Sequence, residues 1–238
     1  MIKTIIVASL LILPEAILGQ GTPFQNLNFE QASPVSTSGP FSPVDVTFAS
    51  AFPGWTAYCG TVQQTDAIQN ASTLNTASVD ILGPTPPSQI ALPNGAPGII
   101  DGNYTAVIQG GVLNGGTGNI VSTSLEQTGT IPSGDNSLLF KAWDNGETGF
   151  SVSFAGKNLS LVDLGPGPNY TLYGANISAY TGATGLLAFT ASAQFAPSFL
   201  ELDDISFSTS SVPEPNPAIF LALGGLLFAA YRRFTKTR

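Results

Sequence analysis

The chain has no histidine and a single cysteine among its 238 residues. Without histidine, a serine nucleophile lacks its usual base, and only Lys141 and Lys157 lie between the two ends of the chain to replace it. Zinc sites of the common kind, built from cysteine and histidine, are also excluded. Because Cys59 has no second cysteine to pair with, we expect a small buried side chain there; the alternative is a bridge between two chains.

Basic residues are scarce as well. Seven Lys and Arg stand against fifteen Asp and Glu, which gives a net charge of −8. A surface of this sign repels nucleic acid and anionic lipid, whose binding proteins present clusters of Lys and Arg. The sequence therefore predicts no nucleic-acid partner. Aromatic and β-branched residues are too frequent for a disordered chain, so we expect a folded body.

Four of the seven basic residues lie in the last seven positions of the chain. Arg232 and Arg233 open a basic tail, residues 232–238, that follows the uncharged run 218–231. That run is short for a membrane span, which needs about 20 residues. A helix over 217–234 would reach about 27 Å at 1.5 Å per residue. We predict a transmembrane helix at 218–231 with a cytoplasmic tail; the alternative is a buried core helix.

The N-terminal end has the features of a secretory signal peptide. Lys3 precedes the apolar run TIIVASLLIL, and Gly19 offers a small residue for cleavage. We therefore expect residues 1–19 to be removed and the mature chain to begin at Gln20. The two ends together predict an exported body at 20–209, a Pro-rich linker at 210–217, and a membrane-anchored precursor.

The C-terminal end resembles the PEP-CTERM sorting signal of Gram-negative bacteria. The matching parts are the motif Val212, Pro213, Glu214 and Pro215, then the apolar run, then the pair Arg232 and Arg233. The resemblance implies recognition by an exosortase, a membrane-embedded processing enzyme. It also implies a final location at the cell surface or in the extracellular matrix. The sequence departs from the family pattern at Asn216-Pro217, where family members often carry Ser-Thr.

The body reads as a series of short strands. Alternation of apolar and polar residues predicts strands within 105–112, 137–143, 150–156, 159–164, 169–180, 186–195 and 199–208. Glycine-rich turns separate them, and residues 82–103 form a Pro- and Gly-rich stretch that we expect to be a surface loop. About 190 residues suit one such domain. The fold class is therefore all-β: a single antiparallel β-sandwich, or jelly roll, between the signal peptide and the transmembrane helix.

The order of motifs resembles the galactose-binding-like jelly rolls of secreted carbohydrate-binding modules. NLNFE opens the body, FPGWTAY follows, and LELDDISF closes it. In that family the first and last strands are adjacent and often hold a structural calcium ion. The resemblance implies Glu30 with Asp203 or Asp204 as the side-chain ligands, completed by carbonyls and water. The alternative is that these carboxylates accept hydrogen bonds at a sheet edge or face solvent. Strand alternation also predicts that the side chains of Asp203 and Asp204 point to opposite faces of the sheet.

Two functions remain open from the sequence. A non-catalytic body would either bind polysaccharide through exposed aromatic rings, for which Trp143 and Tyr104 are candidates, or simply pack in the biofilm matrix. Trp55, in Pro-Gly-Trp, is expected in the core. The alternative is a secreted glycoside hydrolase, which needs two carboxylates at a set separation. Asp144 and Glu147 are the candidate pair, although a solvated hairpin turn explains them equally well. No catalytic residue is assigned.

Overall fold

The computed structural model describes residues 21–39, 44–71, 76–84, 96–113, 118–144, 149–193 and 198–212. The predicted signal peptide, transmembrane helix and basic tail lie outside these residues, as do Pro213, Glu214, Pro215 and Glu147. Among the described residues, no helix is long and apolar enough to cross a membrane. The described helices are one turn each, α1 (Phe48–Ala51) and the 3₁₀ helix η1 (Ser178–Tyr180).

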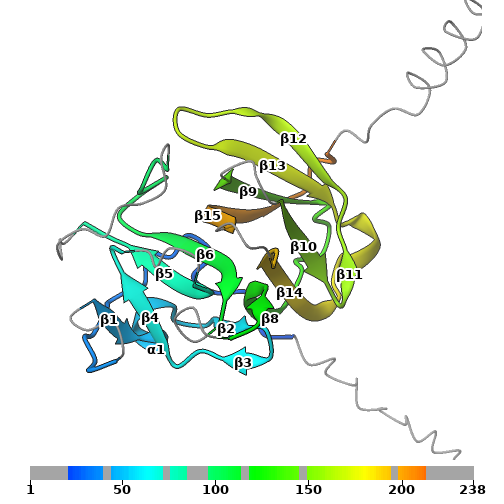
Figure 1. Ribbon diagram of the computed structural model, residues 1–238. Coiled ribbons are helices and arrows are strands. Elements are labelled where there is room, and N and C mark those ends of the chain that lie inside the picture. The colour runs from blue at the N-terminus through cyan, green and yellow to red at the C-terminus, as the bar shows by residue number, and fades with distance from the viewer. Residues whose placement is uncertain are drawn as a thin grey trace, which may run out of the picture.

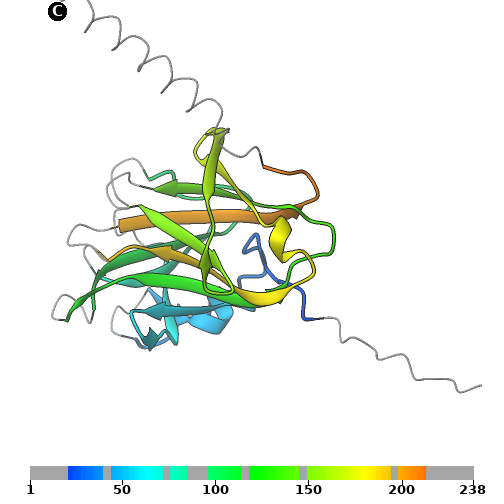
Figure 2. The same ribbon diagram turned by 90° about the vertical axis from the view of Figure 1, so that its right-hand side faces the viewer.

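Two β-sheets make up the body (Figures 1 and 2). The larger has nine strands: in order β1 (Asp45–Thr47), β4 (Asp66–Gln69), β5 (Ser78–Leu82), β6 (Thr105–Val112), β15 (Ser198–Ser208), β9 (Ser137–Asp144), β13 (Thr171–Asn176) and β12 (Leu161–Pro166), with β7 (Ile120–Val121) paired to β6. The smaller has six: β11 (Lys157–Asn158), β10 (Phe150–Phe154), β14 (Thr184–Ala191), β8 (Thr123–Thr130), β2 (Thr56–Cys59) and β3 (Val62–Gln63). The predicted all-β class with two sheets is confirmed.

Among the described strands, pairing is antiparallel except between β4 and β5, which run parallel; the isolated bridges Pro23–Thr130 and Thr76–Val112 are parallel as well. Period-2 alternation located seven of the fifteen described strands, and β6 covers the predicted run 105–112. β5 was not predicted, although Ser78, Val79, Asp80 and Ile81 alternate between polar and apolar residues. All five of its positions are buried, so its polar side chains also lie on a covered face.

The main core lies between the two sheets. Side chains of the larger sheet such as Phe140 and Leu200 meet Val152 and Phe189 of the smaller one, and all four are fully buried. Trp55 is 5% exposed, and its indole N–H donates to the carbonyl of Asn26 at 3.0 Å. The predicted core position of Trp55 is therefore confirmed, with its polar atom satisfied.

Cys59 lies in β2 and is completely buried. The Thr123 hydroxyl donates to its sulfur at 3.6 Å. Burial raises the pKa of the thiol to about 11, against a smaller opposing effect of this hydrogen bond. The interpretation of Cys59 as a small buried side chain is confirmed.

The opening segment differs from expectation. NLNFE, residues 26–30, forms turns instead of a strand. It still lies against the closing strand β15, because the N–H of Ile205 donates to the carbonyl of Leu27 at 3.0 Å. The two ends of the body are therefore adjacent, but a turn-rich segment replaces the expected first strand.

The body also extends slightly further than the predicted boundary at 209. The Ser137 hydroxyl donates to the carbonyl of Ser210 at 2.7 Å. Val212 is 5% exposed and lies so near Gly174 that a Cβ there would meet its Cγ2 at 2.8 Å. All strand pairs and the main core fall within residues 21–212. We therefore expect residues 20–212 to fold without the two terminal segments.

Candidate functional site

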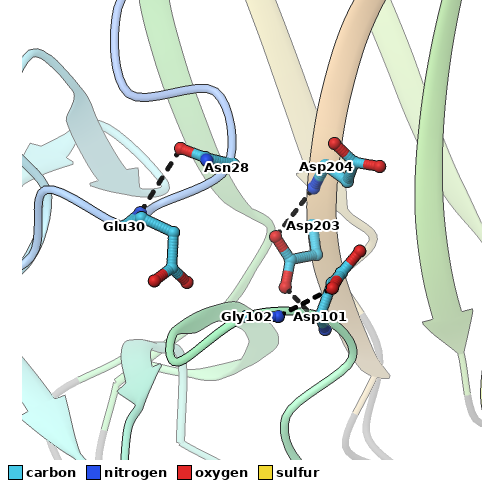
Figure 3. A pocket seen from close by; sticks show the side chains of 6 residues that line it. All are labelled: Asn28, Glu30, Asp101, Gly102, Asp203 and Asp204. Carbon is cyan, nitrogen blue, oxygen red and sulfur yellow. Dashed lines mark hydrogen bonds between the residues drawn. The ribbon is translucent and has the colours of Figure 1, made fainter.

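A small pocket lies where the opening segment, the loop before β6 and strand β15 meet (Figure 3). It has a volume of about 150 Å³ and is lined by Asn28, Glu30, Asp101, Gly102, Asp203 and Asp204. Glu30, Asp203 and Asp204, the candidate ligands named from the sequence, all line it. Asp101 joins them from the stretch expected to be a plain surface loop.

A β-bulge places Asp203 and Asp204 at the same pocket. Asp203 pairs with Lys141 and Ser206 with Leu139, so Asp204 and Ile205 together oppose one residue of β9. Asp204 has a φ of 46°, a left-handed conformation that Asp tolerates better than most residues. The prediction that alternation sends the two aspartates to opposite faces is therefore wrong, because the bulge resets the alternation and returns Ile205 to the core.

Asp203 is 1% exposed, and both of its carboxylate oxygens accept hydrogen bonds. Oδ2 accepts from the Thr105 hydroxyl at 2.6 Å and from the N–H of Asp101 at 3.2 Å, while Oδ1 accepts from the N–H of Asp204 at 2.7 Å. Burial nevertheless raises the pKa of Asp203 to about 7, since the three donors offset only part of the desolvation. Asp203 thus anchors the loop before β6 to the last strand.

Glu30 holds the same loop from the other side. Its Oε1 accepts from the N–H groups of Asn103 at 2.7 Å and Tyr104 at 2.9 Å, and its Oε2 accepts from the Asn103 side chain at 2.9 Å. Burial alone would raise the pKa of Glu30, but these donors outweigh it and lower the pKa. Glu30, which is half-buried, therefore connects the opening segment to the loop before β6.

Lys141 supplies a positive charge beside the pocket. Its Nζ contacts Oδ2 of Asp101 and lies 2.9 Å from Oδ2 of Asp204. Nζ also lies 5.2 Å from the centre of the Tyr170 ring. The hydrogen bond to Asp101 raises the pKa of Lys141, and the same contact lowers the pKa of Asp101. The lysine thus joins β9 to the loop and to the bulge.

The residues of this pocket do not fit a calcium ion as they stand. Calcium prefers six to eight oxygens turned toward one point. Here the oxygens of Glu30 and Asp203 are directed at N–H and O–H donors, and Asp101 and Asp204 face the Lys141 ammonium. Within the described part of the chain, no group of three or more His, Cys, Asp or Glu side chains has an arrangement that could hold a metal ion.

The two aromatic candidates lie on different faces of the larger sheet. Tyr104 packs against the main core, and its ring covers Gly83, where a Cβ would meet its Cε1 at 2.7 Å. Trp143 is half-buried on the outer face, where it packs against the small cluster of Leu82, Val107 and Phe199. The two rings therefore do not form one binding platform.

Trp143 has polar and aromatic neighbours of its own. Tyr170 directly precedes Thr171, the first residue of β13, whose partner on β9 is Ala142, so Tyr170 lies just outside β13 and beside the position of Trp143 on β9. Asn169 donates its side-chain amide to the carbonyl of Ile99 at 3.1 Å. Asp144 pairs with the core residue Leu200 and accepts a long hydrogen bond, 3.4 Å, from the Tyr173 hydroxyl, so its side chain lies on the core face of the sheet, opposite Trp143. We call the group Trp143, Asn169 and Tyr170 the aromatic edge.

A second hollow, of about 230 Å³, lies beside β4 and β5. Its polar lining includes Gln63, Gln64, Asp66 and Ser78, and none of its lining residues is aromatic. It offers hydrogen-bonding groups without a ring on which a sugar could stack. Asp101, Lys141 and this hollow were missed by sequence reasoning, since no motif or periodicity marks them.

No family model and no curated protein matches this chain. Among solved structures, TmCBM61 in complex with β-1,4-galactotriose is similar with a TM-score of 0.39 and 15% identity, covering 78% of this chain and 97% of that one. The enzymatically active domain of tailspike protein 4 from bacteriophage CBA120 has a TM-score of 0.35 and 12% identity, covering 66% and 19%. Both scores lie below 0.5, so no functional argument rests on them.

Proposed function

We propose that this chain is an exported cell-surface or matrix protein whose β-sandwich body, a jelly roll, binds polysaccharide without catalysis. The observation that carries the binding proposal is the aromatic edge. Trp143 keeps part of its ring accessible while its other part is fixed against Leu82, Val107 and Phe199. A ring held in this way loses little conformational freedom when a ligand stacks on it.

The chemistry around Trp143 suits a neutral sugar. The apolar face of a pyranose ring stacks on an aromatic ring, and amide and carboxylate groups bind its hydroxyls. Asn169 supplies an amide on the side of Trp143, because it bonds the carbonyl of Ile99, which packs on the same outer cluster, and Tyr170 supplies a second ring. The body has two lysines against thirteen carboxylates, which favours a neutral polysaccharide over an anionic one.

The state of the carboxylates supports a binding role over hydrolysis. A glycosidase needs two carboxyl groups about 5 to 10 Å apart that face the substrate. In the pocket, the carboxylates of Glu30, Asp101, Asp203 and Asp204 are engaged by protein donors. Of the pair Asp144 and Glu147, Glu147 lies outside the described residues. The glycoside hydrolase remains the alternative, and no further observation favours it.

A glycan array with the purified body, residues 20–212, tests the binding proposal. We expect the wild-type body to bind one class of neutral polysaccharide, and Trp143→Ala to lose most of that binding. Tyr58→Ala is the matched control, because Tyr58 is a half-buried aromatic residue of β2 in the other sheet. Affinity gel electrophoresis in the identified polysaccharide then gives dissociation constants. A wild-type body that binds no glycan, or equal losses for the two variants, would contradict the proposal.

The sorting part of the proposal rests on the two ends of the sequence. The signal peptide directs export, and the PEP-CTERM-like end holds the precursor in the membrane for an exosortase-type enzyme. The body would then be released to the cell surface or the matrix of a Gram-negative bacterium. Its acidic charge and the absence of histidine are compatible with a stable extracellular binding domain, and it needs no nucleic-acid partner.

A further inference from the structure

The resemblance to calcium-holding jelly rolls implies a cation at the corner where the two ends of the body meet. The four carboxylates of that corner are Glu30, Asp101, Asp203 and Asp204, which line one pocket. Such a concentration of negative charge requires compensation, because like charges at short distance repel one another. The structure contains a compensating charge already, and it belongs to the protein.

We infer that the ammonium group of Lys141 is the resident cation of this corner, and that the body closes without a structural metal ion. Nζ of Lys141 contacts Asp101 in the loop before β6 and lies 2.9 Å from Asp204 in the bulge of β15. One side chain of β9 thereby joins the loop before β6 to the last strand, and Glu30 joins the opening segment to the same loop. The inference is independent of whether the body binds polysaccharide.

The remaining carboxylate oxygens lead to the same conclusion. Glu30 accepts three hydrogen bonds from residues 103 and 104, and Asp203 accepts three from Asp101, Thr105 and Asp204. For calcium to enter, Glu30 and Asp203 would have to give up these donors. The ammonium group would also have to leave Asp101 and Asp204. The loop before β6 would lose its attachments to both ends of the body at the same time.

The geometry of β9 places the lysine for this role. Lys141 pairs directly with Asp203, and its side chain is 17% exposed. Its Nζ lies near the Tyr170 ring, which further stabilises a positive charge there. The body has one other lysine, Lys157, which is exposed in the short edge strand β11. Lys157 is therefore a matched control for the loss of one positive charge.

Thermal unfolding of the body, residues 20–212, tests the inference. After treatment with chelator, we expect the same Tm in chelator and in millimolar CaCl₂, since a ligand raises Tm only if it binds the folded state. Lys141→Met should lower Tm by several degrees and Lys157→Met should leave it nearly unchanged. Lys141→Arg, which keeps the charge with a different shape, should restore part of the loss.

Calorimetric titration of CaCl₂ into the wild-type body gives a second readout that does not depend on a variant that folds. We expect no saturable binding. Stoichiometric binding of one calcium ion, with a rise in Tm that is lost in Glu30→Ala, would overturn the inference and establish a metal site. Equal Tm values for Lys141→Met and Lys157→Met would also overturn it.

Discussion

Asp80 and Glu201 project from the same face of the larger sheet on opposite sides of Val107. Val107 of β6 pairs with Asp80 of β5 on one side and with Glu201 of β15 on the other. Both carboxyl groups are buried, at 0% and 1% exposure. Neither oxygen of Glu201 makes a well-formed hydrogen bond with the described residues, and Oδ1 of Asp80 also lacks one. The outer face of the sheet therefore holds two acids in surroundings that favour their neutral forms.

This burial determines the expected pH dependence of stability. Burial raises the pKa of Glu201 to about 8, and the N–H of Gly98 offsets part of this rise. Burial also raises the pKa of Asp80 well above its usual value. Between the unfolded pKa, about 4.5, and about 8, the folded state keeps a proton that the unfolded state has lost. Its free energy of unfolding must then fall as pH rises across that range.

We expect the Tm of the body to be several degrees higher at pH 5 than at pH 8. Glu201→Gln, which is neutral and of similar shape, should flatten this slope, and Glu126→Gln, at a half-exposed position of β8, serves as the control substitution. Below about pH 4 stability should fall again. The pKa values of Glu30 and Asp101 are lowered because their charged forms accept hydrogen bonds in the folded state, and protonation at low pH removes this stabilisation. A Tm that rises from pH 5 to pH 8 would contradict this account.

The sequence predicted the sheets better than it predicted the pocket. Alternation of apolar and polar residues located β15, and it located β6 although seven of the eight β6 residues are buried. It could not reveal the bulge, since Asp204 adopts a positive φ without a glycine to mark the position. Lys141 and Asp101 are far apart in the chain and belong to no motif, so their contact depends on tertiary structure alone.

The buried position of Cys59 predicts low reactivity. At pH 8 the thiol remains almost wholly protonated, since burial raises its pKa to about 11, and the thiolate is the reactive form. We expect a disulfide reagent to label Cys59 in the native body far more slowly than in the unfolded chain. Non-reducing electrophoresis should show monomer alone. Rapid native labelling, or a disulfide-linked dimer, would restore the alternative of a bridge between chains.

The sorting proposal predicts the fate of a truncated chain. Because Val212 packs on the body, the deletion should begin at residue 213 so that the fold is retained. We expect removal of residues 213–238 to release the body in soluble form. Replacement of Arg232 and Arg233 by Ala should leave the precursor associated with the membrane but poorly oriented. Cell fractionation with immunoblotting distinguishes these outcomes. A truncated body that stays in the membrane pellet would refute the anchor.

Gly102 allows a test of how tightly the pocket is built. It has a φ of 58°, and a Cβ at this position would lie 2.4 Å from Oε1 of Glu30, the atom that accepts from Asn103 and Tyr104. Alanine there would cause backbone strain and would also displace the Glu30 carboxylate. Gly156 isolates the first effect, because its φ is 73° and nothing lies within 4 Å of its added Cβ.

We expect Gly156→Ala to cost about 1 kcal/mol, the strain of a non-glycine residue at positive φ. Gly102→Ala should cost about 2 kcal/mol or more, because hydrogen bonds to a charged group are lost in addition. Urea unfolding of the two variants and wild type gives the difference directly. In Glu30→Ala, where the obstructing carboxylate is absent, the added cost of Gly102→Ala should shrink to that of Gly156→Ala. Full additivity of Gly102→Ala and Glu30→Ala would show that the pocket does not depend on this contact.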